Sequence, residues 1–486
     1  MKRKNILSIK AAVIIGISFI LIQSGLGVVG NGNFSSPSYS IYDAINKCYR
    51  WDNDFNDYPT TGFDEVRDIV EFDIDNDGNQ EIIFCGEFDE IGGVSSLGVS
   101  YWDPETDTWS SLAFEFPYLE GEMEQETISF MLIYTIEVYN SNLYIGGHFE
   151  TMTNHPMYIE FHRYLMGIWD QTEEHFELFG DIGIHGGSSA WTMKEFQGDL
   201  YIGGRINWIE DINARNLIKY NGGWSAVSAG VGGQAISLPA GASDGVYDLA
   251  VYDDGNGEDL YVAGMFRHAL EGSHWDYVEI PNTYGIARWD GFYWSSVDGG
   301  LVDPDPEGLN LGSAAVYALS VFDDGSGPAL FVGGDYYELV NLPYIVNHIS
   351  KWDGNNWYRL IDPNGNIGID QYGLIYSLET HNIGSRYALY VGGDFTTAGG
   401  KTVNNIAKWN GNKWTSLGLG ICDRYGSGNP WVKDIYGYNN QLFVGGYFDT
   451  AYNDCKSCLN YQFSYYNSRY HPVESYTVAR WYFSIK

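Results

Sequence analysis

Basic residues are scarce in this chain of 486 residues, which has 26 Lys and Arg against 63 Asp and Glu. The net charge of -37 argues against nucleic acid as a partner, because the phosphate backbone would be repelled. It is typical of a soluble extracellular protein, of a cation-rich or saline environment, or of a protein with a basic partner. Long amphipathic helical patterns are also absent, so the regular structure should consist of strands.

Catalytic motifs are missing as well. The sequence has no Gly-x-Ser-x-Gly, no His-Glu-x-x-His and no Asp box of the sialidase type. These absences favour a binding role over an enzyme.

Cysteine is rare, with five residues at positions 48, 85, 422, 455 and 458. Cys85 replaces a glycine within an expected strand, and we expect it to be a buried small residue. The other four cluster near the expected junction of the two chain ends, where disulfides would form in an exported protein. A zinc site on Cys455-x-x-Cys458 is the alternative, and the sequence does not fix the disulfide connectivity.

Glycine pairs, by contrast, recur along most of the chain. The seven copies are Cys85-Gly86, Gly146-Gly147, Gly203-Gly204, Ala263-Gly264, Gly333-Gly334, Gly392-Gly393 and Gly445-Gly446. Their second members are 61, 57, 60, 70, 59 and 53 residues apart. Each pair ends an apolar strand, and a strand ending in Trp-Asp and a further Trp follow it. Such a period indicates a repeat architecture whose thin units stack on one another.

Four short strands can be recognised in each copy from their alternating pattern. In the fifth copy they are residues 316–322, 329–334, 348–353 and 356–360, joined by turns rich in Gly and Asn. Seven such units predict an all-β chain, a seven-bladed β-propeller of four-stranded antiparallel blades. The glycines should lie where neighbouring backbones leave no space for a Cβ, and the indoles should fill the space between blades.

Two segments carry a resemblance to known repeats. Residues 101–112, TyrTrpAspProGluThrAspThrTrpSerSerLeu, resemble the second half of a kelch repeat, with the glycine pair at the kelch di-glycine position. Residues 389–400 and 406–414 are similar to repeats of secreted microbial propellers, including fungal cortical-marker ectodomains. The pattern changes at Tyr220-Asn221, which replaces Trp-Asp, and at Phe176, which replaces the second Trp. The resemblance implies the fold and leaves the function open.

The N-terminus predicts export. Residues 1–30 combine a basic start, an apolar run from Ala11 to Ile22 and an exit of small residues, which is typical of a signal peptide. The 20 residues from Ala11 to Gly30 are also long enough for a retained membrane anchor. Residues 31–62 form an N-terminal segment, and residues 63–486 form the propeller. The last copy lacks a full fourth strand, so we expect the segment 48–55 to supply it and close the ring.

A calcium loop is predicted in the first copy. Its oxygen ligands would be Asp73, Asp75, Asp77, Asn79 and Glu81. Alternating oxygen side chains with Gly78 at the sharp turn are what a hard cation requires of a short loop. The run resembles the calcium loops of FG-GAP blades of the integrin type, except that Glu81 stands where an Asp is usual. The alternative is a solvated acidic hairpin.

Long connections join the second strand to the third strand or one copy to the next, and in a propeller both classes leave from one face. They carry aromatic residues such as Trp275 and Tyr277, suited to an extracellular protein or a carbohydrate. The residue after each glycine pair varies, and we expect it to point toward the mouth of the central channel. The candidate ligand-binding residues at this position are Glu87, His148, Arg205, Asp335, Asp394 and Tyr447.

The sequence therefore predicts an extracellular or cell-surface module that binds a protein or glycan through the long-loop face. The alternative is a hydrolase or lyase acting on extracellular polysaccharide, with Asp335, Asp394 and Glu87 as its acid-base groups. A passive structural surface protein is a third reading.

Overall fold

The computed structural model describes residues 49–52, 65–114, 126–155, 158–183, 187–232, 244–304, 311–312, 314–339, 342–383, 386–422, 430–448, 450–451 and 477–483. Regular structure in these residues is β-strand throughout, as predicted, and they include no helix long and apolar enough to cross a membrane. Contacts divide the chain into residues 1–48 and 49–486, and all the strands belong to the second unit. The predicted leader at 1–30 and most of segment 31–62 lie outside the described residues.

Seven sheets contain the glycine pairs, and each begins with its innermost strand. The first sheet consists of β2 Glu65–Phe72, β3 Glu81–Glu87, β6 Val99–Asp103 and β7 Thr108–Ser111. The second consists of β9 Glu126–Tyr139, β10 Asn142–His155, β11 Tyr158–Asp170, β12 His175–Asp181 and the short parallel β8 Ala113–Phe114. The third consists of β13 Ser189–Phe196, β14 Asp199–Arg205, β17 Leu217–Tyr220 and β18 Trp224–Ala226. The fourth sheet consists of β20 Gly245–Asp253, β21 Glu258–Met265, β24 Ile286–Trp289 and β25 Trp294–Ser296. The fifth consists of β28 Ala315–Asp323, β29 Pro328–Asp335, β32 Ile349–Trp352 and β33 Trp357–Arg359. The sixth consists of β34 Leu374–Asn382, β35 Tyr387–Asp394, β38 Ile406–Trp409 and β39 Trp414–Ser416. The seventh consists of β41 Trp431–Tyr438, β42 Gln441–Tyr447, β44 Val478–Phe483 and β1 Tyr49–Asp52.

One further sheet, of four strands, corrects the predicted count of seven. It has the order β27-β26-β30-β31, formed by β26 Leu301–Pro304, β27 Leu311–Gly312, β30 Glu338–Leu339 and β31 Leu342–Ile345. These strands lie in connecting segments, between β25 and β28 and between β29 and β32. The described residues thus form eight sheets of four or five strands, because connections predicted as loops also pair with one another.

Shorter pairings occupy other connections. They are β4 Glu90–Ile91 with β5 Val94–Ser95, β15 Trp208–Ile209 with β16 Ile212–Asn213, β36 Thr397–Ala398 with β37 Lys401–Thr402, and β40 Ile421–Cys422 with β43 Thr450–Ala451. A three-stranded sheet joins β19 Val231–Gly232, β22 His268–Ser273 and β23 Asp276–Ile280.

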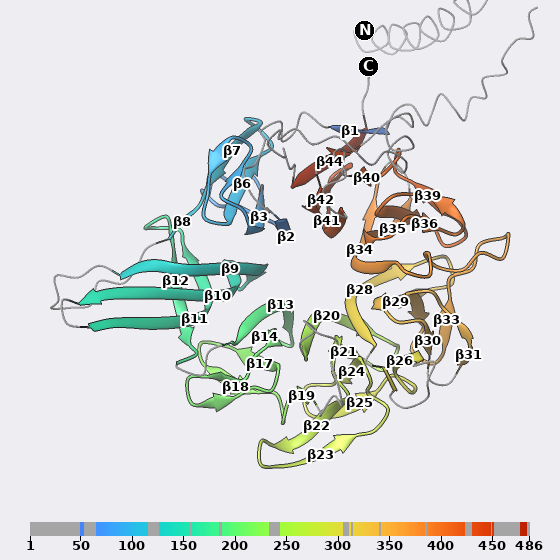
Figure 1. Cartoon of the computed structure of the whole chain (residues 1–486), viewed down its shortest axis with the longest axis horizontal. Helices are drawn as coiled ribbons and strands as arrows, with labels where there is room; N and C mark the ends of the chain where they lie inside the picture. The colour runs from blue at the N-terminus through green and yellow to red at the C-terminus, as the bar shows by residue number, and fades with distance from the viewer. Residues whose placement is uncertain are drawn as a thin grey trace, which may run out of the picture. The chain divides into compact units, whose positions relative to one another are not determined.

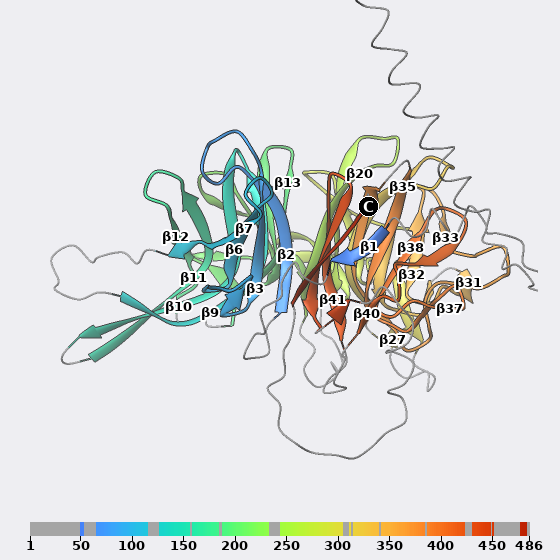
Figure 2. The ribbon, with the colours of Figure 1, turned by 90° about the horizontal axis from the view of Figure 1, so that it is seen from above.

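The innermost strands of the seven glycine-pair sheets surround a common axis. Each contacts the next in the order β2, β9, β13, β20, β28, β34 and β41, and β41 contacts β2. Figure 1 views this arrangement along the axis, and each sheet extends outward from its innermost strand. Figure 2 shows β2 and β41 extending along the axis.

The second glycine of each pair faces a bulge in the innermost strand. In β28 the pairing with β29 skips Tyr317, so Val316 pairs with Gly334 and Ala318 with Gly333. A Cβ at Gly334 would lie 2.1 Å from the carbonyl oxygen of Ala315, and the same contact recurs at the other six second glycines at 2.0 to 2.3 Å. The prediction that these glycines meet neighbouring backbone is confirmed. Only glycine lets the two strands pair around the bulge.

The first glycine faces the next sheet instead. A Cβ at Gly392 would lie 2.5 Å from Cγ1 of Val432 on β41, and a Cβ at Gly445 would lie 2.5 Å from Cγ1 of Val66 on β2. Here the clash is with a side chain rather than with backbone. Cys85, one of the two residues that replace this glycine, is a buried free cysteine as predicted.

The Trp-Asp motif forms the hairpin between the third and fourth strands. Asp290 accepts hydrogen bonds from the backbone N–H groups of Phe292 and Tyr293, both at 2.7 Å, which closes the turn. The two indoles on either side, Trp289 and Trp294, are cross-strand partners with ring centroids 5.1 Å apart.

The hydrophobic core lies between neighbouring sheets. One buried cluster joins Phe331 and Ile349 of one sheet to Leu378, Leu389 and Trp409 of the next. Polar tips of aromatic side chains also cross these boundaries. The indole N–H of Trp289 donates to the hydroxyl of Tyr201 at 3.3 Å, as expected for indoles that fill the space between blades.

The N-terminal strand β1 lies at the outer edge of the seventh sheet. It pairs antiparallel with β44, with Tyr49 opposite Phe483 and Asp52 opposite Arg480. The first described residues of the chain thus pair with the last described ones.

The glycine contact leads to a stability prediction. We expect Gly393→Ala to lower the free energy of unfolding by at least about 2 kcal/mol, because its Cβ would lie 2.0 Å from the carbonyl oxygen of Leu374. Gly223→Ala is the control, since no atom lies within 4 Å of the Cβ position there. Denaturant unfolding monitored by Trp fluorescence measures both variants. Equal midpoints would contradict the assigned role of the second glycine.

Candidate functional site

Seven bulge residues, one from each innermost strand, face the central axis. They are Arg67, Tyr134, Trp191, Tyr247, Tyr317, Tyr376 and Lys433, here called the belt. A bulge re-aims the side chain of the extra residue, which would otherwise pack within the sheet. All seven line one central cavity of about 830 Å³.

Aromatic contacts run along the belt from one strand to the next. The ring of Trp191 stacks on Tyr247 with centroids 5.1 Å apart and an interplanar angle of 5°. Tyr247 and Tyr317 follow at 5.0 Å, and Tyr317 and Tyr376 at 5.3 Å. Tyr134 meets Trp191 edge-on at 6.4 Å. Five aromatic residues thus form a continuous arc around the axis.

Two cations complete the belt where the aromatic arc ends. The guanidinium of Arg67 lies 4.3 Å from the ring centroid of Tyr134, and the ammonium of Lys433 lies 5.1 Å from that of Tyr376. Glu65 and Glu87 accept hydrogen bonds from Arg67 at 2.9 and 3.0 Å, which fixes the position of the guanidinium. Arg67 and Lys433 stand on the contacting strands β2 and β41.

The belt lies near the end of the ring from which the longer connections leave. In each sheet the second strand returns to the start of the innermost strand, so Glu87 pairs with Glu65 and Asp394 with Leu374. The bulge is two residues further along the innermost strand. The connections from second to third strand therefore emerge beside the belt.

Below the belt, three buried carboxylates link neighbouring innermost strands. Asp68 accepts hydrogen bonds from the hydroxyl of Thr135 and the backbone N–H of Ile136, both at 2.9 Å. Asp248 accepts from the backbone N–H of Leu319 at 2.6 Å. These carboxylates join β2 to β9 and β20 to β28, and Asp434 accepts from the hydroxyl of Ser377 on β34 at 3.4 Å.

Burial shifts the acid-base equilibrium of these groups. Burial raises the pKa of Asp248 to about 7 and the pKa of Asp68 to about 6, against the opposing effect of their hydrogen bonds. The pKa of Asp434 is raised further, by burial and by the nearby charge of Asp68. Further along the innermost strands, burial raises the pKa values of Glu137 and Glu379 to about 7.

The predicted ligand-binding residues occupy a different position. Glu87, His148, Arg205, Asp335, Asp394 and Tyr447 each follow a second glycine and pair with the residue two positions before the bulge residue of the innermost strand. The lining of the central cavity comes from the innermost strands alone. The six residues therefore stand at the rim, one strand away from the cavity wall.

Their contacts are individual rather than shared. Glu87 contacts Arg67, and Tyr447 stacks on Trp431 with centroids 4.8 Å apart. His148 lies 2.9 Å from the carbonyl oxygen of Ser188.

The rim carboxylates also have separate surroundings. The carboxylate of Asp335 lies 3.9 Å from Nδ1 of His348, and burial raises the pKa of Asp335. Burial and then the charge of Asp370 raise the pKa of Asp394.

Sequence reasoning missed the belt, although a signal for it exists. The belt residues lie 19, 13, 13, 17, 17, 17 and 13 residues before the second glycine of their copies, so they form one column once the turn between the first and second strands is allowed to vary in length. That column holds Arg, Tyr, Trp, Tyr, Tyr, Tyr and Lys, where a strand with one face in the core would alternate regularly. An aromatic and basic column at a fixed place in every repeat indicates a shared surface.

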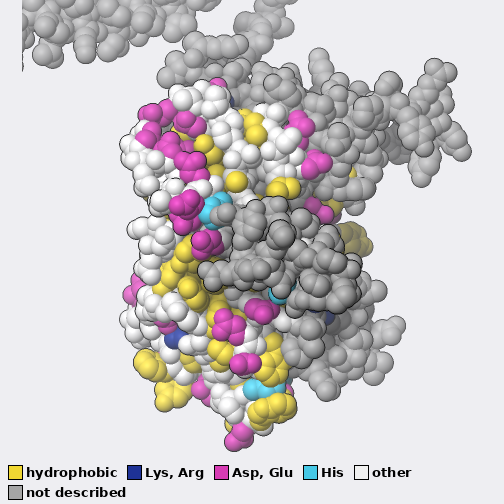
Figure 3. All heavy atoms as spheres, turned by 90° about the vertical axis from the view of Figure 1, so that its left-hand side faces the viewer, with side chains coloured by type: hydrophobic (Ala, Val, Ile, Leu, Met, Phe, Trp, Pro, Cys, Tyr) yellow, Lys and Arg dark blue, Asp and Glu magenta, His cyan; other side chains and the backbone are white. Residues whose placement is uncertain are grey.

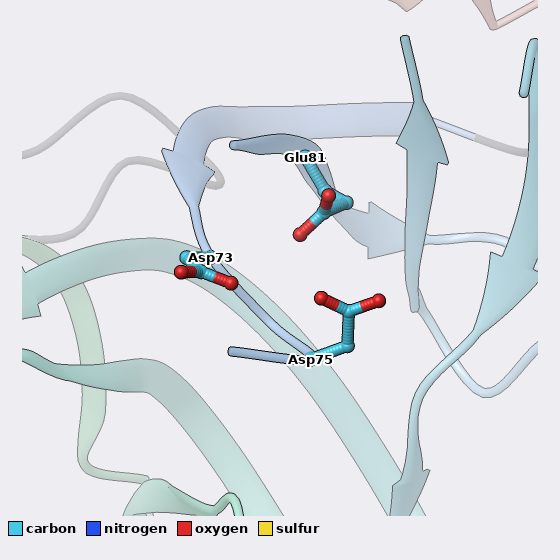
Figure 4. Close-up of side chains that lie close together, drawn as sticks. All are labelled: Asp73, Asp75 and Glu81. Atoms are coloured by element: carbon cyan, nitrogen blue, oxygen red, sulfur yellow. The ribbon is translucent and has the colours of Figure 1, made fainter. Parts of the chain in front are cut away.

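The acidic loop of the first sheet brings three carboxylates together. Oxygen atoms of Asp73, Asp75 and Glu81 lie within 4.8 Å of one another, and Figure 4 shows the three side chains converging. Glu81 is 3% exposed and accepts a hydrogen bond from the backbone N–H of Ile74 at 2.9 Å. Burial raises the pKa of Glu81, and the charges of Asp75, Asp103 and Asp77 raise it further.

The other two predicted ligands, Asp77 and Asn79, stand slightly apart. Asp77 accepts hydrogen bonds from the backbone N–H and the side-chain amide of Asn79, at 2.8 and 3.2 Å. They shape the turn, while the other three carboxylates converge.

The acidic loop of the first sheet is better suited to a hard cation than the equivalent turns of two other sheets, because a basic side chain already pairs with an acid in each of those turns. Arg288 on β24 pairs with Asp254 at 2.7 Å, and Lys351 on β32 pairs with Asp324 at 2.8 Å. The corresponding position on β6 holds Tyr101, which is neutral. In addition, Oδ1 of Asp73 is buried without a hydrogen-bond partner.

Outside the ring, the β22–β23 hairpin carries the exposed aromatics predicted for the long connections. Trp275 at its tip is 87% exposed, and Tyr277 lies under the guanidinium of Arg215, 4.3 Å from its ring centroid. Figure 3 views another side, where acidic side chains are spread over the described surface and few basic ones are visible. The predicted disulfides cannot be placed, because Cys48, Cys455, Cys458 and the Cys422 side chain lie outside the described residues.

No family model and no curated protein matches the chain. Among solved structures, the chain is similar to the extracellular domain of the putative hybrid two component system BT4673 from B. thetaiotaomicron, with 12% identity and a TM-score of 0.25. The match covers 83% of this chain and 52% of that chain, so the chain spans about half the length of this neighbour.

The buried carboxylates predict a pH dependence. Because the pKa of Asp248 is about 7 in the folded protein and 3.8 as a free side chain, the folded state holds a proton that the unfolded chain has released between these values. Stability should therefore fall as pH rises through this window. Asp248→Asn should remove a slope of up to about 1.4 kcal/mol per pH unit.

Denaturant unfolding at several pH values from 4.5 to about 7.5 measures this slope against the wild type. Asp276→Asn, at an exposed carboxylate, is the control and should keep the wild-type slope. Parallel curves for the wild type and Asp248→Asn would show that Asp248 is ionised throughout the window.

Proposed function

We propose that the chain is an exported binding module that recognises an extracellular protein or glycan at the end of the ring where the long connections leave. The observation that carries this proposal is the belt, because five aromatic and two basic side chains from separate repeats face one cavity. Aromatic side chains provide rigid contact area at little entropic cost. Export, with a cleaved signal peptide or a retained anchor, rests on residues 1–30.

The architecture behind this proposal is a closed ring of kelch-like blades. Support comes from the seven innermost strands, which contact one another in sequence and return to the first. The pairing of β1 with β44 supports closure of the ring by the N-terminal strand.

A matched pair of tryptophan variants tests the binding function. The wild-type protein is screened against arrays of glycans and of extracellular proteins, and Kd is measured for whatever it captures. Trp191→Ala should weaken binding about tenfold or more, because it interrupts the aromatic arc. Trp275→Ala removes an indole that is 87% exposed on the β22–β23 hairpin and should leave Kd unchanged.

Thermal melting confirms that both variants fold. A loss confined to Trp275→Ala would move the site to the outer connections. Turnover of a polysaccharide that disappears in Asp335→Asn or Asp394→Asn would replace the binding function by a hydrolase or lyase.

We further propose that the first sheet holds a structural calcium ion. Asp73, Asp75 and Glu81 supply convergent oxygens, and the neutral Tyr101 leaves them without the cation that Arg288 and Lys351 provide elsewhere. The ion would fix the turn between β2 and β3. It would also favour the ionised form of Glu81, so binding should weaken as pH falls.

Calorimetric titration with Ca²⁺ and terbium luminescence test this site. Asp75→Asn should lower the affinity at least about tenfold, because it removes one charged ligand. Asp323→Asn is the control, since Asp323 closes the equivalent turn on Gly325 and Gly327 in a sheet where Lys351 supplies the cation. No heat of binding, together with a melting temperature unchanged by chelator, would make the loop an acidic hairpin.

A further inference from the structure

Lys433 is the cation of the central cavity that has no fixed partner. Its ammonium lies over the ring of Tyr376 at 5.1 Å, and no hydrogen bond or ion pair to it is found among the described residues. Arg67, on the neighbouring strand, has its guanidinium held by Glu65 and Glu87. Burial lowers the pKa of Lys433 and the charge of Arg67 lowers it further, against the opposing charges of Glu65, Asp434 and Asp248. A ligand carboxylate would give this ammonium the direct hydrogen-bonded partner that no described side chain provides.

The aromatic arc offers polar edges more than open ring faces. Neighbouring rings from Trp191 to Tyr376 pack at centroid distances of 5.0 to 5.3 Å, stacked in the first pair and tilted in the next two, so a ligand in the cavity meets ring edges and polar tips. Burial raises the pKa values of Tyr247 and Tyr376 to about 12, which keeps both hydroxyls protonated. A phenol hydroxyl both donates and accepts hydrogen bonds. Ser320 and Tyr436 add two more hydroxyls to the lining.

The remaining charges of the cavity limit the charge of the ligand. Asp68, Asp248 and Asp434 line the cavity below the belt, and Glu137 and Glu379 lie deeper. Lys194 is 3.6 Å from Glu137 and is partly neutralised by it. A ligand with several negative charges would find only Lys433 without a direct carboxylate partner, because Arg67 and Lys194 are paired with glutamates, so one ligand charge can be compensated. The volume of about 830 Å³ suits a small molecule of one or two rings.

From these observations we propose that the cavity binds a sugar that carries a single carboxylate, with Lys433 and Arg67 contacting the carboxylate and the belt hydroxyls contacting the sugar hydroxyls. This assignment rests on the proposed binding function and names its ligand class. Hydroxyl-rich chemistry distinguishes this ligand from a plain aromatic acid, and the single charge distinguishes it from a nucleotide. The carboxylate end would lie at β2 and β41, and the rest of the sugar would extend along the arc.

Titration of the full chain with glucuronic acid and galacturonic acid, against glucose, galactose and inorganic phosphate, tests the assignment. At least one uronic acid should bind ten times or more tightly than its neutral counterpart and than phosphate. Lys433→Met should abolish this preference, and Lys433→Arg should retain it. Lys413→Met, at an exposed lysine, is the control and should behave like the wild type.

A second measurement does not depend on the folding of a variant. In the wild-type protein, the bound uronic acid should protect Lys433 from acetylation, as measured by peptide mass spectrometry, while Lys413 remains reactive. Equal binding of neutral and acidic sugars, or tighter binding of phosphate, would overturn the assignment. If no sugar binds while capture of a protein partner still depends on Trp191, this inference fails and the proposed function stands. If neither occurs, both fail.

Discussion

The contact between each second glycine and a carbonyl oxygen of the innermost strand determines the rest of the structure. At 2.0 to 2.3 Å the space for a Cβ is closed by backbone, which cannot move without breaking the pairing of the first two strands. The bulge opposite the glycine follows from the same approach, since the extra residue has no partner on the second strand. Local backbone geometry, repeated seven times, thus decides which side chain faces the axis.

This geometry assigns packing between sheets and lining of the central cavity to different residues of the innermost strand. The residues on either side of the bulge, such as Val316 and Leu319, pack between sheets and form the core. The bulge residue takes no part in that core, so it is free to be aromatic or basic without loss of packing. The residue after the bulge carries a hydrogen-bonding side chain in several sheets, and Asp68 and Asp248 at this position join adjacent innermost strands. The stability of the ring and its inner surface can therefore vary independently.

Much of this fold can be predicted from the sequence because its signals are local. The glycine pairs, the Trp-Asp turn closed by residues such as Asp290, and the buried Cys85 all lie within a few residues of what they contact. The eighth sheet could not be predicted, because β26 and β30 pair across an intervening strand pair without a periodic pattern. The belt was missed because the strand register, rather than residue type, decides that Tyr317 faces the axis while Asp335 stands at the rim.

Charge compensation explains how so acidic a chain forms a tightly packed ring. Arg288 and Lys351 neutralise the hairpin acids of their sheets, and Asp68, Asp248 and Asp434 are placed where burial raises their pKa values and favours the neutral form. Both arrangements leave few uncompensated charges near the axis. Two groups are compensated less directly, since the carboxylates around Glu81 face the neutral Tyr101 position and the Lys433 ammonium has no ion pair among the described residues. A charge that the chain itself does not supply would complete both groups, which is the role proposed for the calcium ion and for the ligand carboxylate.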